Sequence, residues 1–158
     1  MSNFMPFMPK RDSMAMWIIC ESIGRDSALV DKMQKNPDGS YPVKFEVGGV
    51  ELDFSRFTEE NFPIQSEMTK DDYIIICGDF GGVWTFEEES SKEKEALDWL
   101  NNKNFTTLFV DGNHENYTRL YNYPIEEWKG GKVHKIRDSV LHLMRGEIFD
   151  IDNKKIFA

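Results

Sequence analysis

Cysteine, long apolar runs and basic residues are all scarce in this chain of 158 residues. Its two cysteines, Cys20 and Cys77, cannot make a disulfide framework, and Cys77 lies in an apolar run that predicts a buried free thiol in a reducing compartment. The apolar run from Met14 to Cys20 is only seven residues long, too short for a membrane span or a signal peptide. We therefore expect a cytoplasmic protein.

Lysine and arginine number 19 against 28 aspartates and glutamates, which gives a formal net charge of −9. The imbalance lies in residues 59–98, which hold twelve acidic and three basic residues, so the rest of the chain sums to zero. Nucleic-acid backbones are bound by clustered Lys and Arg, so direct nucleic-acid binding is not expected. The acidic segment instead predicts a basic protein surface as partner, such as that of a nucleic-acid enzyme, contacted by Glu87, Glu88 and Glu89. The alternative is that these glutamates form a solvated helix start.

Apolar residues make up 40% of the chain and aromatic residues 13%, enough for one folded domain with an appendage. The appendage is residues 1–53. Apolar spacing predicts helices over 14–23 and 26–35. Alternating apolar residues on either side of Gly48-Gly49, over 43–47 and 50–54, predict a β-hairpin.

Residues 54–158 predict an α/β domain. The apolar, β-branched runs at 73–77 and 106–110 have the composition of parallel strands buried on both faces. A helix over 87–102 joins them in a β-α-β unit, and a second helix is expected over 113–121. Four further strands are expected at 132–136, 140–144, 147–151 and 154–158.

Both buried runs stop at a glycine beside polar side chains, in Gly78-Asp79-Phe80-Gly81-Gly82 and Gly112-Asn113-His114-Glu115. The carboxyl ends of strands are where open α/β sheets bind ligands. These segments resemble the calcineurin-like metallophosphoesterases, in particular small bacterial and phage members, from about Phe54 to the end of the chain. The resemblance implies a truncated metallophosphoesterase-like β-sandwich layer. It also implies that Asp79 bridges two metal ions, that Asn113 binds one of them, and that His114 acts on the leaving group or the transition-state charge.

Much of the family's metal site has no counterpart here. The family opens with an Asp-x-His motif on its first strand, and aligning backward from Asp53-Phe54 puts Gly49 and Glu51 at those positions. Glu51 is a possible replacement ligand or else a solvent-facing hairpin residue. The family's later His and Gly-His-x-His ligands have no counterpart before Ala158. We therefore expect residues 1–53 to be an unrelated phage-type segment fused to a phosphoesterase fragment, 54–158, with its hairpin or a homodimer covering the open edge of the sheet.

Three functions remain after these departures. The first is a binding or inhibitory module without a cofactor, of the kind of a phage-encoded acidic inhibitor (anti-CRISPR type); it is favoured because the missing ligands are directly visible. The second is a metal-dependent hydrolase of phosphomono- or diesters, using Mn²⁺, Zn²⁺ or Fe, with its site completed by oligomerisation or a second chain. The third is a fragment that only folds. His134 and His142 are expected to be ordinary surface or rim residues on opposite sides of their strands.

Overall fold

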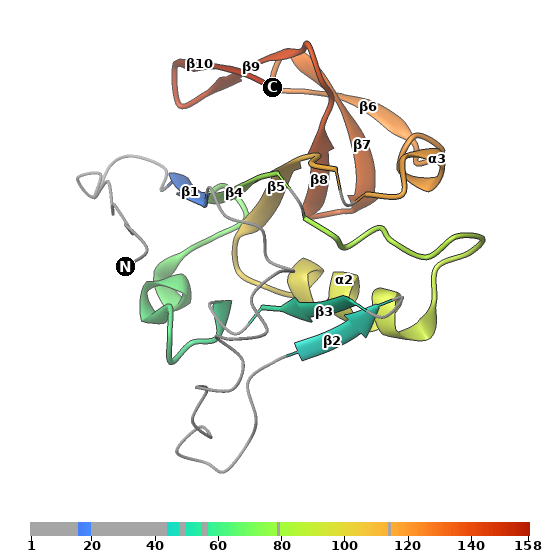
Figure 1. The fold of residues 1–158 in the computed structure, drawn as a ribbon. Coiled ribbons are helices and arrows are strands. Elements are labelled where there is room, and N and C mark those ends of the chain that lie inside the picture. The colour runs from blue at the N-terminus through green and yellow to red at the C-terminus, as the bar shows by residue number, and fades with distance from the viewer. Residues whose placement is uncertain (1–15, 20–43, 48–49, 55–56, 79, 114) are drawn as a thin grey trace.

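A computed structural model describes residues 16–19, 44–47, 50–54, 57–78, 80–113 and 115–158 of the protein. Its main element is a six-stranded mixed sheet in the order β1-β4-β5-β8-β7-β6, shown in Figure 1. The first four strands in that order are parallel, and β7 and β6 run antiparallel to their neighbours. The strands are β1 (Met16–Ile19), β4 (Tyr73–Cys77), β5 (Thr106–Val110), β8 (Val140–Leu143), β7 (Gly131–Arg137) and β6 (Ile125–Trp128). The fold is mixed α/β, as the sequence predicts.

The strands predicted within residues 54–158 are confirmed to within one residue at each end. They include a second hairpin, β9 (Ile148–Ile151) with β10 (Lys154–Phe157), joined by the predicted tight turn at Asp152 and Asn153. Both turn residues have positive φ, 51° and 57°, as a primed two-residue turn requires. Strand β6 was not predicted, because its exposed glutamates do not show the alternating apolar pattern of a strand. It forms by pairing with β7.

The predicted helices are shorter than expected. Helix α2 spans Ser91–Asn101 because Ser90, the residue before it, accepts the N–H of Glu93 on its side chain and so caps the helix start. Helix α3 is a single turn, Tyr117–Leu120. A 3₁₀ helix, η2 (Pro63–Glu67), precedes β4. No helix among the described residues is long and apolar enough to span a membrane.

The helix predicted over residues 14–23 is wrong where the structure describes it. Residues 16–19 form β1, which pairs in parallel with β4, Met16 opposite Tyr73. A short apolar run fits a buried helix or a buried strand equally well, and here pairing with the sheet decides the outcome. The helix predicted over 26–35 lies outside the described residues.

The predicted first hairpin is confirmed as β2 (Lys44–Val47) and β3 (Val50–Asp53). It forms a two-stranded sheet of its own beside α2 instead of covering an edge of the main sheet (Figure 1). The edge position next to β4 belongs to β1, so that part of the prediction is wrong. A two-stranded hairpin gains most of its stability by packing on another element, and α2 supplies that support.

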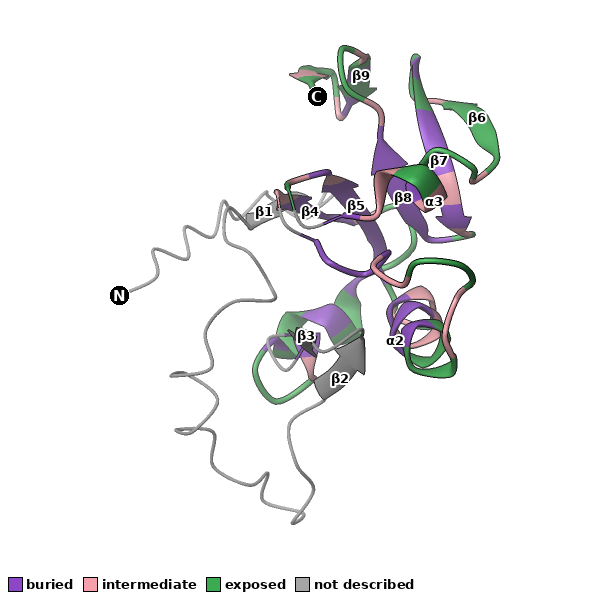
Figure 2. Ribbon diagram, turned by 45° about the vertical axis from the view of Figure 1, so that its right-hand side comes forward, coloured by how far each residue is buried: buried purple, intermediate pink, exposed green. Residues whose placement is uncertain are grey.

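The core lies on both faces of the sheet, as Figure 2 shows by the buried central strands. On one face Ile74 and Ile76 of β4 pack with Leu97 and Leu100 of α2. On the other face Ile75 belongs to a second cluster, which includes Val133, Leu143, Phe149 and Ile151 and is covered by β9. Each such side chain stabilises the fold by about 1.5–3 kcal/mol when fully buried. Burial on both faces holds the strand ends in place.

Candidate functional site at the ends of β4 and β5

The loops that follow β4 and β5 leave the sheet side by side. The two strands end in register, with Cys77 opposite Val110. Gly78 then takes a φ of 84°, a conformation that favours glycine, and donates its N–H to the carbonyl of Val110 at 3.0 Å. The segments that carry the two resembling motifs therefore start from one edge, called here the strand-end edge (residues 78–82 and 111–115).

Glu115 ties the two loops together. Its Oε1 accepts the N–H of Phe80 at 2.8 Å and that of Gly112 at 3.3 Å, and its Oε2 accepts the N–H of Gly81 at 3.0 Å. The residue is 7% exposed. A buried carboxylate that accepts several backbone N–H groups fixes the geometry of both loops at once. The motif contains Glu115, but its bridging role was not predicted, because its partners are backbone groups with no sequence signal.

Phe80 anchors the first loop to the core. Its ring stacks on Phe109 of β5 with centroids 4.2 Å apart. A Cβ on Gly82 would lie 2.3 Å from the Phe80 ring, so only glycine fits there without moving the aromatic pair. The glycine run of the first motif thus serves a close approach between loop and core.

The positions of the predicted ligands are only partly described. Asp79 and His114 lie outside the described residues. Asn113 lies at the strand-end edge and is exposed. Glu51 lies on β3, opposite Glu46 in the separate hairpin, and its side chain is outside the described part of the chain.

Asp111 is a further carboxylate at this edge, and the sequence prediction missed it. Its side chain is fully buried. Oδ1 lies 3.0 Å from His142 Nε2, and Oδ2 lies 2.6 Å from Arg145 Nη2. Burial alone would raise the pKa of Asp111, but the hydrogen bond from His142 and the ion pair with Arg145 outweigh it and lower that pKa. Asp111 is therefore a charged carboxylate occupied by two side chains.

His134 and His142 are not surface residues on opposite sides, as the sequence suggested. They lie directly opposite each other on β7 and β8 and are 2% and 1% exposed. Their rings stack 5.2 Å apart, and their Nδ1 atoms are 2.9 Å apart. The prediction failed because the spacing of two histidines does not reveal the register of their strands.

This histidine pair holds a single shared proton between its Nδ1 atoms. A carboxylate only accepts, so His142 Nε2 carries the hydrogen that binds Asp111. Two Nδ1 atoms 2.9 Å apart require one donor and one acceptor, which excludes a doubly protonated pair. Burial lowers the pKa of both His134 and His142. His142 and His134 thus form a neutral pair behind the charged Asp111 carboxylate.

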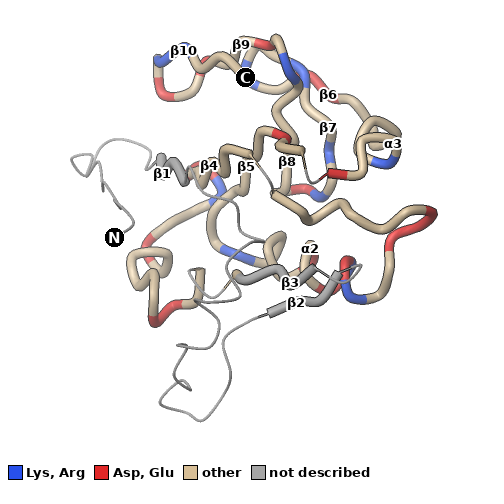
Figure 3. The backbone as a smooth tube through the Cα atoms, viewed as in Figure 1, with Lys and Arg blue, Asp and Glu red and all other residues tan. Residues whose placement is uncertain are grey.

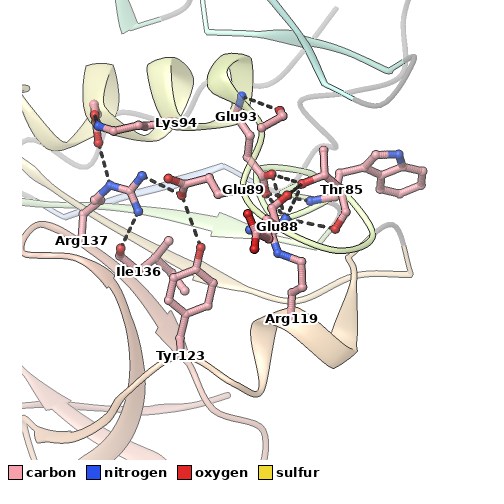
Figure 4. Close-up of polar contacts among 12 residues, drawn as sticks. Thr85, Glu88, Glu89, Glu93, Lys94, Arg119, Tyr123, Ile136 and Arg137 are labelled. Atoms are coloured by element: carbon pink, nitrogen blue, oxygen red, sulfur yellow. Dashed lines mark hydrogen bonds and ion pairs between the residues drawn. The ribbon is translucent and has the colours of Figure 1, made fainter.

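The three glutamates predicted to contact a partner differ in their surroundings. Glu87 and Glu88 are exposed, at the end of the loop between β4 and α2 where Figure 3 shows red. Glu89 lies 2.7 Å from Arg137 Nη2 and 3.5 Å from the Tyr123 hydroxyl (Figure 4). It is half-buried in an internal ion pair. The alternative expectation, that these glutamates start a helix, is wrong, since α2 begins after all three.

The loop is held at its base by a second buried carboxylate, Glu93, which is fully buried. Its two oxygens each lie 2.8 Å from Nη1 of Arg119, and it accepts the N–H of Trp84 at 3.1 Å. Thr85 also donates its hydroxyl to Glu93, while Arg119 donates to the Thr85 carbonyl at 3.0 Å (Figure 4). The loop is therefore fixed in place by a charged cluster.

The donor set offered by the described residues is too small for a metal centre by itself. No group of three or more His, Cys, Asp or Glu in the described ranges is arranged to hold a metal ion. Asp111 is engaged by Arg145 and His142, and Glu115 by backbone N–H groups. Asn113, an exposed residue, is the member of the predicted ligand set at this edge that the structure describes.

Comparisons with protein-family models, with curated proteins and with solved structures find no match to this chain.

Proposed function

We propose that this chain is a metallophosphoesterase-like protein whose strand-end edge forms one half of a site for hydrolysing phosphomono- or diesters. The observation that carries the proposal is the Glu115 carboxylate, which accepts N–H groups from both motif-bearing loops. A site needs its groups fixed before the substrate arrives, and this contact keeps the loops at one edge. The finer fold proposed with it is a metallophosphoesterase-like sandwich layer.

In this proposal a divalent cation would be held by Asp79 and Asn113, together with ligands from a second copy or another chain. The ion would polarise a phosphoryl oxygen. His114 would act beside the leaving group. Glu115 keeps the two loops at a fixed separation and is not a ligand, because its oxygens already accept backbone hydrogens. Residues 1–53 remain the proposed appendage, although β1 joins the main sheet.

The experiment is hydrolysis of an aryl phosphodiester and an aryl phosphomonoester by the full chain in excess Mn²⁺. We expect turnover that Asp79→Ala abolishes and that rises with protein concentration if a second copy completes the site. Glu95→Gln, an exposed acid on α2, serves as the matched control and should leave turnover unchanged. Turnover equal in the wild type and Asp79→Ala would overturn the proposal.

A second candidate function, favoured by a different observation, is a binding or inhibitory module that docks on a basic protein surface. Phe86 is 88% exposed, next to the exposed Glu87 and Glu88, and the loop that presents them is anchored through Glu93 and Arg119. An exposed aromatic side chain on a fixed loop is a suitable interface anchor, since little conformational entropy is lost on binding. An inhibitor of the anti-CRISPR type would use such a loop against a Lys- and Arg-rich channel.

This second function predicts binding that weakens with salt and with charge reversal. The variant is Glu87→Lys with Glu88→Lys, which leaves the internal ion pairs intact. Glu89→Lys is the contrasting change: it places a second cation beside Arg137 and should destabilise the fold instead. Binding kinetics on a purified basic target at low and high salt measure the effect. Association rates indifferent to salt and to the double reversal would remove this candidate.

A further inference from the structure

We propose that Arg145 binds a phosphoryl group at the strand-end edge. This inference rests on the proposed phosphoester site and names a side chain that neither motif contains. Arg145 follows the end of β8, the strand next to β5. Through Asp111 and Tyr117 it is linked to the loop that carries Asn113.

Asp111 and Tyr117 together set the position of the Arg145 guanidinium. Nη2 lies 2.6 Å from Asp111 Oδ2 and donates to the Tyr117 hydroxyl at 3.0 Å. The guanidinium carbon lies 5.5 Å from the centre of the Tyr117 ring, within cation–π range. Tyr117 in turn donates its hydroxyl to the carbonyl of Gly112. One tyrosine therefore separates the guanidinium from the second motif.

Two nitrogens of this guanidinium remain available. Nη2 makes both polar contacts, whereas Nε and Nη1 have no partner among the described residues. The side chain is 59% exposed. Either nitrogen can donate to a phosphoryl oxygen, but the two do not form a parallel pair, because each forked edge of a guanidinium includes Nη2.

An exposed arginine paired with an acid is commonly a weak surface ion pair. Arg145 differs because its acid partner is fully buried and is also bound by His142. The carboxylate cannot follow the arginine into solvent, so it holds Nη2 in place while the side chain stays exposed. That arrangement prepares a cation for an anion at low conformational cost.

The test uses the full chain in EDTA with inorganic phosphate and then phenyl phosphate as probes. Nuclear magnetic resonance follows the Arg145 Nε–H signal and the backbone signals of Gly112 and Asn113. We expect saturable shifts of these signals. Arg145→Gln should weaken phosphate binding at least about tenfold, and Arg145→Lys by less, since a charged hydrogen-bond pair accounts for that range. Tyr117→Phe, which keeps the ring and removes the hydroxyl, should weaken binding by a smaller factor.

Lys94→Ala is the matched control, because Lys94 is an exposed cation paired with Asp98 on α2. An equal loss in Lys94→Ala and Arg145→Gln, or phosphate shifts that avoid Gly112 and Asn113, would overturn the inference. Thermal melts confirm that each variant is folded.

The two proposals fail in different ways. Phosphate binding at Arg145 without any Mn²⁺-dependent turnover would contradict the proposed function alone. Turnover that needs Asp79, with phosphate affinity and KM unchanged in Arg145→Gln, would contradict this inference alone. Asp79→Ala in EDTA should retain phosphate binding, because no metal takes part in that measurement.

Discussion

Two buried glutamates fix two loops of this protein by different chemistry. Glu115 holds the strand-end edge through backbone N–H groups of Phe80, Gly81 and Gly112. Glu93 holds the loop between β4 and α2, called here the acidic loop, through the guanidinium of Arg119 and the hydroxyl of Thr85. The first arrangement depends on backbone conformation, and the second depends on particular side chains.

The difference lies in which groups each glutamate engages. The donors around Glu115 are backbone N–H groups, so these contacts engage no charged side chain other than Glu115 itself. In the Glu93 cluster the charged side chains themselves are consumed by the contacts. The acidic loop is therefore held by paired charges, whereas the two loops of the strand-end edge are joined by one carboxylate and backbone groups.

The largest effect is expected from Arg119→Met. It leaves the fully buried Glu93 without its cation, and breaking one partner of a buried ion pair costs about 3–5 kcal/mol. Urea unfolding of the variant measures the loss. The control is Lys92→Met, which removes an exposed cation paired with Glu95 and should change stability by less than about 1 kcal/mol. Equal stability of the two variants would show that the Glu93 cluster does not hold the loop.

A smaller effect is expected from Glu115→Gln. The amide keeps one acceptor oxygen but sets an N–H₂ group against one of the three backbone donors, and an unsatisfied buried donor costs about 1–3 kcal/mol. Hydrogen exchange should accelerate at Phe80, Gly81 and Gly112 more than at the α2 amides. Uniform acceleration across the chain would mean that Glu115 supports the whole fold rather than the edge.

The strands and the edge were predictable from sequence, but most of the contacts there were not. The buried runs at 73–77 and 106–110 are long, β-branched and bounded by glycine, so pattern alone located both loops. The Glu115 contacts involve backbone groups, and the His134–His142 pair depends on strand register, neither of which leaves a residue signature. The strand β1 was not predicted, because a run of four apolar residues fits a helix or a strand equally well. Its pairing with β4 decides between them.

A third prediction concerns pH and the histidine pair behind Asp111. Burial lowers the folded pKa of His142 below its ordinary value near 6.5, so the unfolded chain binds more protons once the pH falls below that value. Stability is complete above about pH 6.5 and declines below it, by at most about 1.4 kcal/mol per pH unit for each proton taken up. His142→Gln, which can still donate to Asp111, should flatten this decline. Urea midpoints between pH 5.5 and 7.5 measure it, and an identical decline in the variant would contradict the assignment.

Paramagnetic broadening by Mn²⁺, added in small steps to the full chain in a nuclear magnetic resonance experiment, distinguishes the two regions most directly. If the strand-end edge is the functional site, the signals of Gly78, Gly81, Gly112 and Asn113 broaden first, and Asp79→Ala removes the effect. Broadening that begins at Glu87 and Glu88 and persists in Asp79→Ala would contradict the account, because the ion would then be attracted by surface charge alone.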